Sequence, residues 1–464
     1  MSTETAAPVV PAATTAPAET VEPAVNFMRI SEAADKKDQV VTFRGWAAHV
    51  RKARKTLYFV ELRDGTGYCQ CVIFGKELCD AEKVKFLTRE CSIEVTGTLK
   101  AYEGKNHAPE IADILNLEMQ VSAWHLVGES PVDIENIINK DSSVPQLMDN
   151  RHIALRSEHT QQVLKLRSEI QWYFRKYYHD NKFTEIQPPT IVKTQCEGGS
   201  TLFKLTYFNE AAYLTQSSQL YLESVIASLG KSFCMLSSYR AEQSRTVRHL
   251  AEYLHLEAEL PFITFDDLLA HLEDLVCTVV ENVMAVHGEK IMKMNPHFKM
   301  PTRPFKRMTY ADAIKFCNDN KILNKDKPFE FGEDISEKPE RQMTDMIGCP
   351  IFMIHFPSKM KAFYMSKVPG HTDLTESVDL LMPGVGEIVG GSMRIWDYKE
   401  LMDAYKANGL NPKPYYWYTD QRKYGSCPHG GYGLGVERLV MWMLGEDHIR
   451  KVCLYPRYIE RCEP

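Results

Sequence analysis

The chain has 464 residues and a formal net charge of −6, with 44% hydrophobic and 25% charged residues. This size and composition are typical of a soluble protein with two or three globular domains. The sequence excludes a membrane-spanning helix, because no apolar run approaches the ~20 residues required and Glu281 interrupts the best candidate. The 12 cysteines include no C-x-x-C pair, which argues against a structural zinc site or disulfide framework and favours reduced thiols in the cytosol.

The first residues have a composition unlike the rest of the chain. Residues 1–26 are rich in Ala, Pro, Thr and Glu and contain no Lys or Arg. They match neither a transit peptide, which needs arginine, nor a signal peptide, which needs a basic start and an apolar stretch. We therefore expect a disordered tail over residues 1–27.

Residues 28–125 are expected to form a small all-β domain. Short alternating runs such as VVTFRGWA, TLYFVELR and CSIEVTGTL are separated by turn signals, a pattern that suits an OB-fold barrel. The stretch His49 to Lys55 is expected to be a turn that places five cationic residues beside the strand of Phe59. A basic loop next to an exposed ring suits single-stranded nucleic acid. The alternative is a solvated loop and a core phenylalanine.

The next segments read as a hinge and two helices. Residues 126–155 are irregular, and we expect a hinge there. Ser157 to Asp180 carries apolar residues at helical spacing, and a second helix is expected to begin at the capping-box pattern of Thr264 to Asp267. Residues 290–362 alternate short apolar pieces with Lys/Pro-rich turns and form the least readable part, expected to be an insertion.

The most informative stretch is Arg240 to Glu257, RAEQSRTVRHLAEYLHLE, which predicts a hairpin. Its second half alternates, so that Tyr253, His255 and Glu257 face one side and Leu254 and Leu256 the other. A guanidinium, a cationic loop, a ring and a carboxylate together suit a nucleotide. The alternative is an edge hairpin with a solvated basic turn.

This hairpin also resembles a known motif. The text YRAEQSRTVRHLAEYLHLEAE is similar to the second signature motif of the class II aminoacyl-tRNA synthetases, in the form used by the aspartyl and asparaginyl branch. GYGLGVER at residues 431–438 resembles the third motif and is followed by CLYPR, while FTEIQPP at residues 183–189 resembles the first. The resemblance covers nearly everything beyond residue 27.

The resemblance implies an α+β protein: an N-terminal OB-fold anticodon-binding domain (28–125), then a catalytic domain (156–464) built on an antiparallel sheet flanked by helices. It also implies roles for individual residues. Two acids, Asp379 and Glu387, are implied as Mg²⁺ ligands, which suits a cation that prefers hard oxygen ligands. The residues implied to bind ATP are Arg240, Glu242, His249, Tyr253 and Arg438.

The resemblance further implies two interfaces. The helix at 157–180 and the segment ending at Pro189 would form a homodimer interface. Phe59 and Gln70 would stack on and read the central anticodon base, and Glu110 is a further candidate for anticodon binding.

The amino-acid pocket departs from the aspartyl pattern. Leu222 stands where aspartyl enzymes carry a lysine, so a substrate carboxylate would lack its counter-charge. Arg394 is implied to donate to a side-chain carbonyl, and Glu257 can accept from an amide NH₂. Glu197 and Gln219 match positions that bind the substrate's α-amino group. The pattern favours asparagine over aspartate.

We therefore expect a cytoplasmic, ATP- and Mg²⁺-dependent ligase that activates asparagine and transfers it to the 3′ end of tRNA(Asn). Its expected partners are tRNA(Asn), asparagine and a second copy of itself, with no membrane. The alternatives are an aspartyl enzyme, an asparagine synthetase on the same fold, and an inactive RNA-binding relative. Asparagine synthetases of this fold dispense with the anticodon module, which argues against the second.

Overall fold

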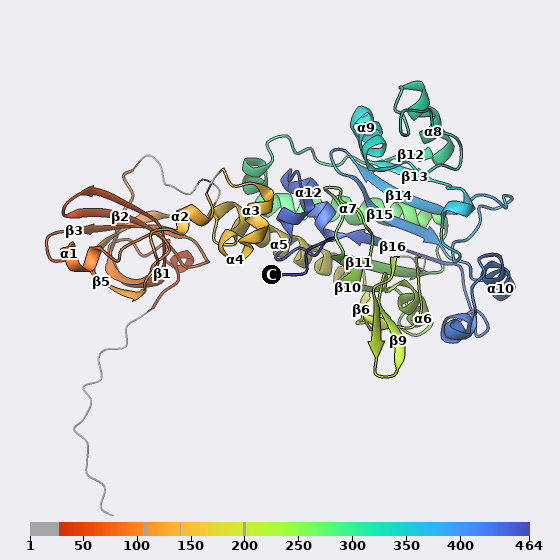
Figure 1. The fold of residues 1–464 in the computed structure, drawn as a ribbon, viewed down its shortest axis with the longest axis horizontal. Helices are drawn as coiled ribbons and strands as arrows, with labels where there is room; N and C mark the ends of the chain where they lie inside the picture. Colours follow the sequence, from red (N-terminus) through yellow and green to blue (C-terminus); the bar gives the residue numbers. More distant parts are fainter. Residues whose placement is uncertain (1–26, 105–109, 111, 140, 198–200) are drawn as a thin grey trace, which may run out of the picture. The chain divides into compact units, whose positions relative to one another are not determined.

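The computed structural model describes residues 27–104, 110, 112–139, 141–197 and 201–464 (Figure 1). The expected tail at 1–27 lies outside these ranges except for its last residue. The chain divides into two compact units, residues 1–139 and 140–464, and each is described by itself. Within the described residues, no helix combines the length and the apolar character needed to cross a lipid bilayer.

The first unit contains a closed barrel, which confirms the expected OB fold. Around the barrel the strands are β1 (Val40–Arg54), β2 (Leu57–Arg63), β3 (Tyr68–Phe74), β5 (Ile114–Gly128) and β4 (Ser92–Ala101). The short helices η1 (Ile30–Glu32) and α1 (Ala81–Val84) accompany them. Alternate residues point inward, so that Val60, Leu62, Cys71 and Ile93 are fully buried.

The basic stretch His49 to Lys55 is not the turn that we predicted. β1 continues through Arg54, which pairs with Leu57, so only residues 55 and 56 form the turn. The cationic side chains therefore lie along a strand. Arg51 pairs with Phe59 across the ladder, and its guanidinium lies 4.4 Å from the ring centroid. Phe59 is only half-buried, unlike its neighbour Tyr58, so the alternative of a core phenylalanine is wrong.

The second unit is built on an eight-stranded sheet. In sheet order its strands are β12 (Lys306–Thr309), β13 (Ile351–Ile354), β14 (Ser377–Met382), β15 (Gly386–Met393), β16 (His429–Gly435), β11 (Glu252–Pro261), β10 (Ser232–Tyr239) and β6 (Thr184–Glu185). The pairs from β13 to β10 are antiparallel, as expected, but the outermost pairs β12/β13 and β10/β6 are parallel. β11 lies between β16 and β10, so the hairpin is not at an edge.

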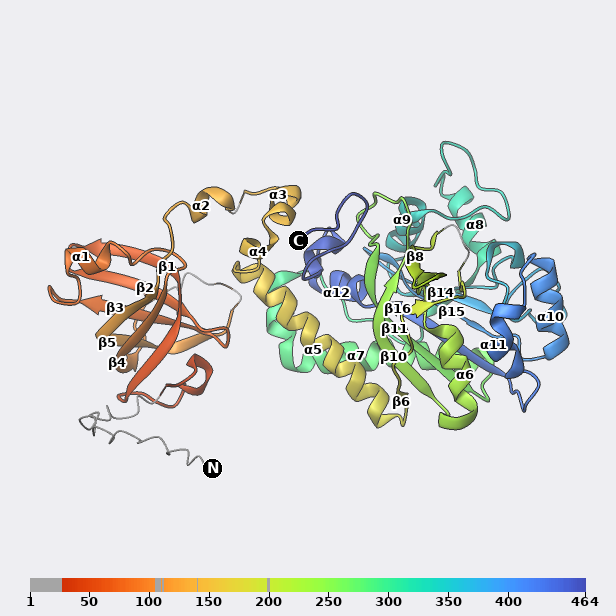
Figure 2. The ribbon, with the colours of Figure 1, turned by 60° about the horizontal axis from the view of Figure 1, so that its bottom comes forward.

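Helices cover one face of this sheet. α5 (Glu158–Asp180) is capped by Ser157, and α7 (Phe265–Met294) begins with the predicted capping box of Thr264 and Asp267. The two helices lie side by side, and Tyr177 donates to Asp274 at 2.8 Å (Figure 2). They share one core with α12 (Val436–Leu444) and with the inward residues of the strands. The opposite face of the sheet is not covered by these helices, and the candidate site lies on it.

Smaller elements complete this unit. A second sheet has the strand order β7 (Ile191–Val192), β9 (Glu210–Leu214) and β8 (Lys204–Tyr207). α6 (Gln219–Leu229), α10 (Tyr398–Ala407), η4 (Lys413–Tyr415) and α11 (Tyr416–Asp420) contribute to a separate hydrophobic cluster. Residues 290–362 are ordered: β12 and β13 extend the main sheet, and α8 (Tyr310–Asp319) and α9 (Glu337–Ile347) close a small core of their own, followed by η3 (Ser358–Met360).

The segment 126–155 is less irregular than we expected. β5 continues to Gly128, and three short helices follow: α2 (Ile134–Ile137), α3 (Val144–Asp149) and α4 (Arg151–Ala154). Arg151 is buried and donates to the carbonyls of Leu454 at 2.9 Å and Lys451 at 3.2 Å, beside η5 (Ile449–Val452). The C-terminal segment in turn pairs with β11, because Ala251 N donates to Arg457 O at 2.7 Å. These contacts fix α4 to the second unit.

Candidate active site

A cavity of about 820 Å³ opens on the face of the sheet that the helices leave uncovered. Tyr253, His255 and Glu257 of β11 line it, while Leu256 packs in the core behind them. This is the predicted alternation. All the predicted site residues of the second unit except Pro189 line this cavity. They are Glu197, Gln219, Arg240, Glu242, His249, Tyr253, Glu257, Asp379, Glu387, Arg394 and Arg438.

One part of the cavity carries a ring and a guanidinium. Arg240 follows β10 directly, and its guanidinium lies 5.4 Å from the Tyr253 ring centroid. Its partner is Glu197, with 2.6 Å between Arg240 Nη2 and Glu197 Oε2. Burial opposes the positive charge, but Glu197 and the neighbouring Tyr253, Glu242 and Glu387 together raise the pKa of Arg240. Arg240 Nε is buried and has no hydrogen-bond partner within the described ranges, so this arginine can still bind an anion.

A second cationic group lies nearby. Arg438, from the start of α12, donates to Glu387 Oε2 at 3.0 Å. His249 Nε2 lies 3.7 Å from Glu242 Oε2. Burial, followed by the charge of Arg438, lowers the pKa of His249, so the imidazole is neutral at pH 7. Arg240 and Arg438 give this end of the cavity the fixed positive charge that a polyphosphate needs.

The two predicted metal acids lie on adjacent strands. Lys361 Nζ donates to Asp379 at 2.8 Å. Burial raises the pKa of Asp379 to about 6 although Lys361 opposes the rise. Glu387 is different: burial favours its neutral form, but Arg438 and Arg248 hold its pKa at about 2. A Cβ on Gly390 would lie 3.3 Å from Glu387 Oε1 and 3.7 Å from Asp379 Oδ1, so both carboxylates converge on this glycine.

The other end of the cavity is built around Glu257. This residue is only 2% exposed. It accepts a hydrogen bond from the Ser217 hydroxyl and another from Ser218 N at 2.8 Å. Burial raises the pKa of Glu257 to about 6, while both serine hydrogen bonds oppose the rise. Leu222, which is buried and also lines the cavity, brings no cation to this end.

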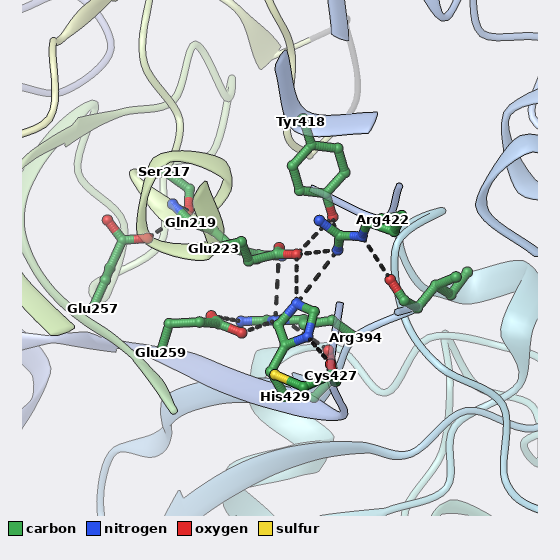
Figure 3. A network of polar contacts seen from close by, with 12 residues as sticks. Ser217, Gln219, Glu223, Glu257, Glu259, Arg394, Tyr418, Arg422, Cys427 and His429 are labelled. Atoms are coloured by element: carbon green, nitrogen blue, oxygen red, sulfur yellow. Dashed lines mark hydrogen bonds and ion pairs between the residues drawn. The ribbon is translucent and has the colours of Figure 1, made fainter. Parts of the chain in front are cut away.

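Arg394 is held by residues that the sequence reasoning missed. Its Nε and Nη2 each donate to Glu259 at 3.1 Å, and its Nη1 donates to Ser392 at 2.8 Å (Figure 3). Glu259 is two residues after Glu257 on β11, so the alternation could have identified it. Close to it lies a second ion pair, Glu223 with Arg422, for which the sequence carries no periodic signal.

Three of these buried groups are arranged like metal ligands. One ligand atom each from Glu223, Glu259 and His429 lies within 4.8 Å of the others. Two guanidinium groups already pair with these carboxylates, because Arg394 binds Glu259 and Arg422 binds Glu223. A cation placed here would meet two fixed positive charges, so we do not assign a metal to this cluster.

The remaining predicted residues lie elsewhere. Phe59 and Gln70 both point away from the barrel core on neighbouring strands, and Gln70 donates to Glu118 at 3.0 Å. Glu110 is exposed between β4 and β5. Pro189 is exposed just after β6, so its placement leaves it accessible to a partner.

Comparison with known proteins identifies the family. Residues 143–459 match tRNA synthetases class II (D, K and N), and residues 41–127 match an OB-fold nucleic acid binding domain. The cytoplasmic asparagine–tRNA ligase of Bos taurus is 51% identical over 445 residues, which cover 95% of this chain and 78% of that protein.

Two solved structures are similar over most of the chain. Entamoeba histolytica asparaginyl-tRNA synthetase in complex with asparaginyl-adenylate is 84% identical with a TM-score of 0.91, covering 96% of this chain and 100% of that one. The Pyrococcus horikoshii enzyme complexed with asparaginyl-adenylate is 35% identical with a TM-score of 0.83, covering 93% and 98%. The chain belongs to the class II tRNA synthetases of the D, K and N group.

Proposed function

We propose that this protein is an asparagine–tRNA ligase of the cytoplasm. It joins asparagine to ATP as asparaginyl-adenylate with release of pyrophosphate, and then transfers the asparaginyl group to the 3′ end of tRNA(Asn) with release of AMP. Relatives at about half identity carry this activity and location in their names. One observation carries the choice of substrate: the buried carboxylate of Glu257 stands at one end of the cavity with no cation at Leu222.

Asparagine fits this end of the cavity by complementary hydrogen bonding. The Arg394 guanidinium donates to the side-chain carbonyl, and Glu257 accepts from the side-chain NH₂. A substrate carboxylate would instead face Glu257 without a neutralising lysine at Leu222, and a buried uncompensated charge is costly. Glu197 and the amide oxygen of Gln219 accept from the α-ammonium group.

The activation step needs positioning and charge neutralisation rather than a protein nucleophile. The carboxylate oxygen of asparagine attacks the α-phosphorus of ATP, and the bond to the pyrophosphate oxygen breaks. When substrates bind, the ion pair of Glu197 and Arg240 separates, so that Glu197 is free for the ammonium group and Arg240 for the α-phosphate. The adenine ring stacks on Tyr253, with Glu242 accepting from its amino group.

The leaving pyrophosphate is held from the opposite side. Arg438 lies over the adenine and reaches the γ-phosphate, with the neutral His249 as a further donor. Asp379 and Glu387 would hold Mg²⁺, and the space over Gly390 together with two converging oxygen ligands suits that ion. Bound Mg²⁺ supplies charge neutralisation of the phosphate oxygens. Lys361, which donates to Asp379 in this structure, would move away from that carboxylate when Mg²⁺ binds.

The two units divide the work on tRNA. We infer an anticodon-binding domain over residues 28–125 and a catalytic domain over residues 156–464, joined by residues 126–155. The outer face of the barrel supports this, since Phe59 offers a partly exposed ring for stacking and Arg51 a neighbouring cation. Gln70, already aligned by Glu118, offers an amide to a base edge.

We also propose a homodimer formed through α5 and the segment ending at Pro189. Trp172 of α5 is 54% exposed, so a large apolar side chain lies on the part of this helix that does not pack in the core. Light scattering measures the mass in solution, and we expect twice the chain mass for the wild type and a smaller mass for Trp172→Glu. A monomeric wild-type protein would contradict the proposed homodimer but not the proposed activity.

The function itself is tested by amino-acid-dependent ATP–pyrophosphate exchange with asparagine and with aspartate, followed by aminoacylation of tRNA(Asn) and tRNA(Asp) transcripts. We expect exchange with asparagine and charging of tRNA(Asn). Exchange with aspartate instead would place the chain among aspartyl enzymes. No exchange with either amino acid would indicate an inactive RNA-binding relative.

A further inference from the structure

A fully buried carboxylate, Glu223, contacts two residues that line the amino-acid end of the cavity, Gln219 and Arg394 (Figure 3). Its Oε2 accepts from Tyr418 at 2.8 Å and from the guanidinium of Arg422, and it lies 3.0 Å from His429 Nε2. Burial opposes its negative charge, yet Arg422 and His429 hold the pKa of Glu223 well below its ordinary value. Glu223 is therefore ionised at neutral pH.

Glu223 contacts two residues that face the substrate. Its Oε1 accepts from Gln219 Nε2 at 2.9 Å, which fixes the amide so that Gln219 Oε1 is left for another donor. The same oxygen lies 4.0 Å from Arg394 Nε. One buried carboxylate thus orients the acceptor for the α-ammonium group and lies beside the guanidinium that faces the side chain.

The cluster is balanced in charge. Arg394 pairs with Glu259, and Arg422 pairs with Glu223. Both nitrogens of His429 lie near acceptors, the Cys427 carbonyl at 2.8 Å and the Glu223 carboxylate at 3.0 Å. No positive charge is left over to neutralise a negatively charged substrate side chain.

We propose that Glu223 is a specificity-determining residue that excludes aspartate because, together with Glu259, it neutralises the positive charges of Arg394 and Arg422. The inference rests on the proposed function and deepens it, since it assigns part of the amino-acid choice to a residue outside substrate contact. Specificity gained by denying a competitor its counter-charge is a form of discrimination against that competitor. Removing the charge of Glu223 while keeping its shape should leave the cluster with one excess positive charge, which an aspartate side chain can neutralise.

The test measures ATP–pyrophosphate exchange, with the KM of asparagine and the KI of aspartate as a competitor. In Glu223→Gln, the ratio of KI(aspartate) to KM(asparagine) is expected to fall about tenfold, a typical coupling between neighbouring charges. Arg422→Gln changes the charge in the opposite direction, and the ratio should rise. The double variant restores the balance and should return the ratio towards the wild-type value.

The matched control is Glu90→Gln, which removes the carboxylate from another buried pair. Glu90 binds Arg63 through two hydrogen bonds of 2.9 and 2.8 Å within the barrel, which the exchange reaction does not use. Its ratio should equal that of the wild type. If Glu223→Gln does not fold, Arg422→Gln carries the test with its opposite sign.

An unchanged ratio in Glu223→Gln, or equal losses with both amino acids, would mean that Glu223 only supports the fold and would overturn the proposal. A ratio that falls in Arg422→Gln would do the same. These outcomes differ from failure of the proposed function, in which the wild-type protein would show no asparagine-dependent exchange.

Discussion

Replacing Glu257 by Gln should weaken asparagine activation while leaving the fold at least as stable. A hydrogen bond to a charged group contributes about 1.5–3 kcal/mol, so losing the carboxylate acceptor should lower kcat/KM for asparagine roughly 10- to 150-fold. The serine contacts survive the change, because the glutamine oxygen can accept from Ser218 N and its NH₂ can donate to the Ser217 hydroxyl.

The stability effect has a definite dependence on pH. Since burial raises the pKa of Glu257 from 4.5 to about 6, the carboxyl favours the folded state below pH 4.5, and this contribution is lost as pH rises through 6. The difference between the two pKa values corresponds to about 2 kcal/mol. Relative to the wild type, Glu257→Gln should therefore gain about 2 kcal/mol of unfolding free energy between pH 4 and pH 7.

Two assays check this reasoning. Denaturant unfolding across this pH range measures the free energy, and ATP–pyrophosphate exchange measures the activity, whose acidic limb near pH 6 should disappear in Glu257→Gln. Ser217→Ala removes a hydrogen bond that lowers the pKa of Glu257, so the limb should move to higher pH in that variant. An asparagine kcat/KM within twofold of the wild-type value, or a loss of stability at pH 7, would refute the argument.

Three further changes test other parts of the protein. Phe59→Ala should raise the KM for tRNA in aminoacylation about tenfold through lost base stacking, while ATP–pyrophosphate exchange without tRNA stays at the wild-type level. An equal loss of exchange would contradict the proposal that Phe59 acts only in tRNA binding. Asp379→Asn should raise the Mg²⁺ concentration for half-maximal exchange about tenfold, and an unchanged titration would remove Asp379 from the ion's ligands. Leu222→Lys introduces an ammonium at a buried position, so asparagine-dependent exchange should fall at least about tenfold and aspartate should gain relative to asparagine; equal losses would mean that Leu222 only fills space.

Local patterns predicted much of this molecule. The alternation in β11 placed Tyr253 and Glu257 on the cavity side, and the capping pattern at Thr264 located the start of α7. Such signals work because the period of a strand or helix decides which side chains share a face. The roles of the site residues and the domain limits remain predictions that the experiments above address.

What the sequence could not predict depends on distant contacts. Glu223 meets Arg422 across 199 residues and His429 across 206, and no local period marks these pairs. The basic stretch of β1 was misread for a related reason, since its continuation to Arg54 is fixed by pairing with Leu57 rather than by its own composition. Residues 290–362 were unreadable because their short pieces become regular only where β12 and β13 join the sheet.

The contacts of Arg151 with the C-terminal segment bear on how the protein is made. A ribosome delivers the chain from its N-terminus, and domains generally fold in that order. Every strand of the barrel ends by Gly128, so this unit can close while the remainder is still being translated. The second unit has to wait, because Ala251, just before β11, gains its acceptor at Arg457, and Arg151 its acceptors at Lys451 and Leu454, only when those residues emerge. During most of synthesis a finished barrel would therefore precede an incomplete second unit.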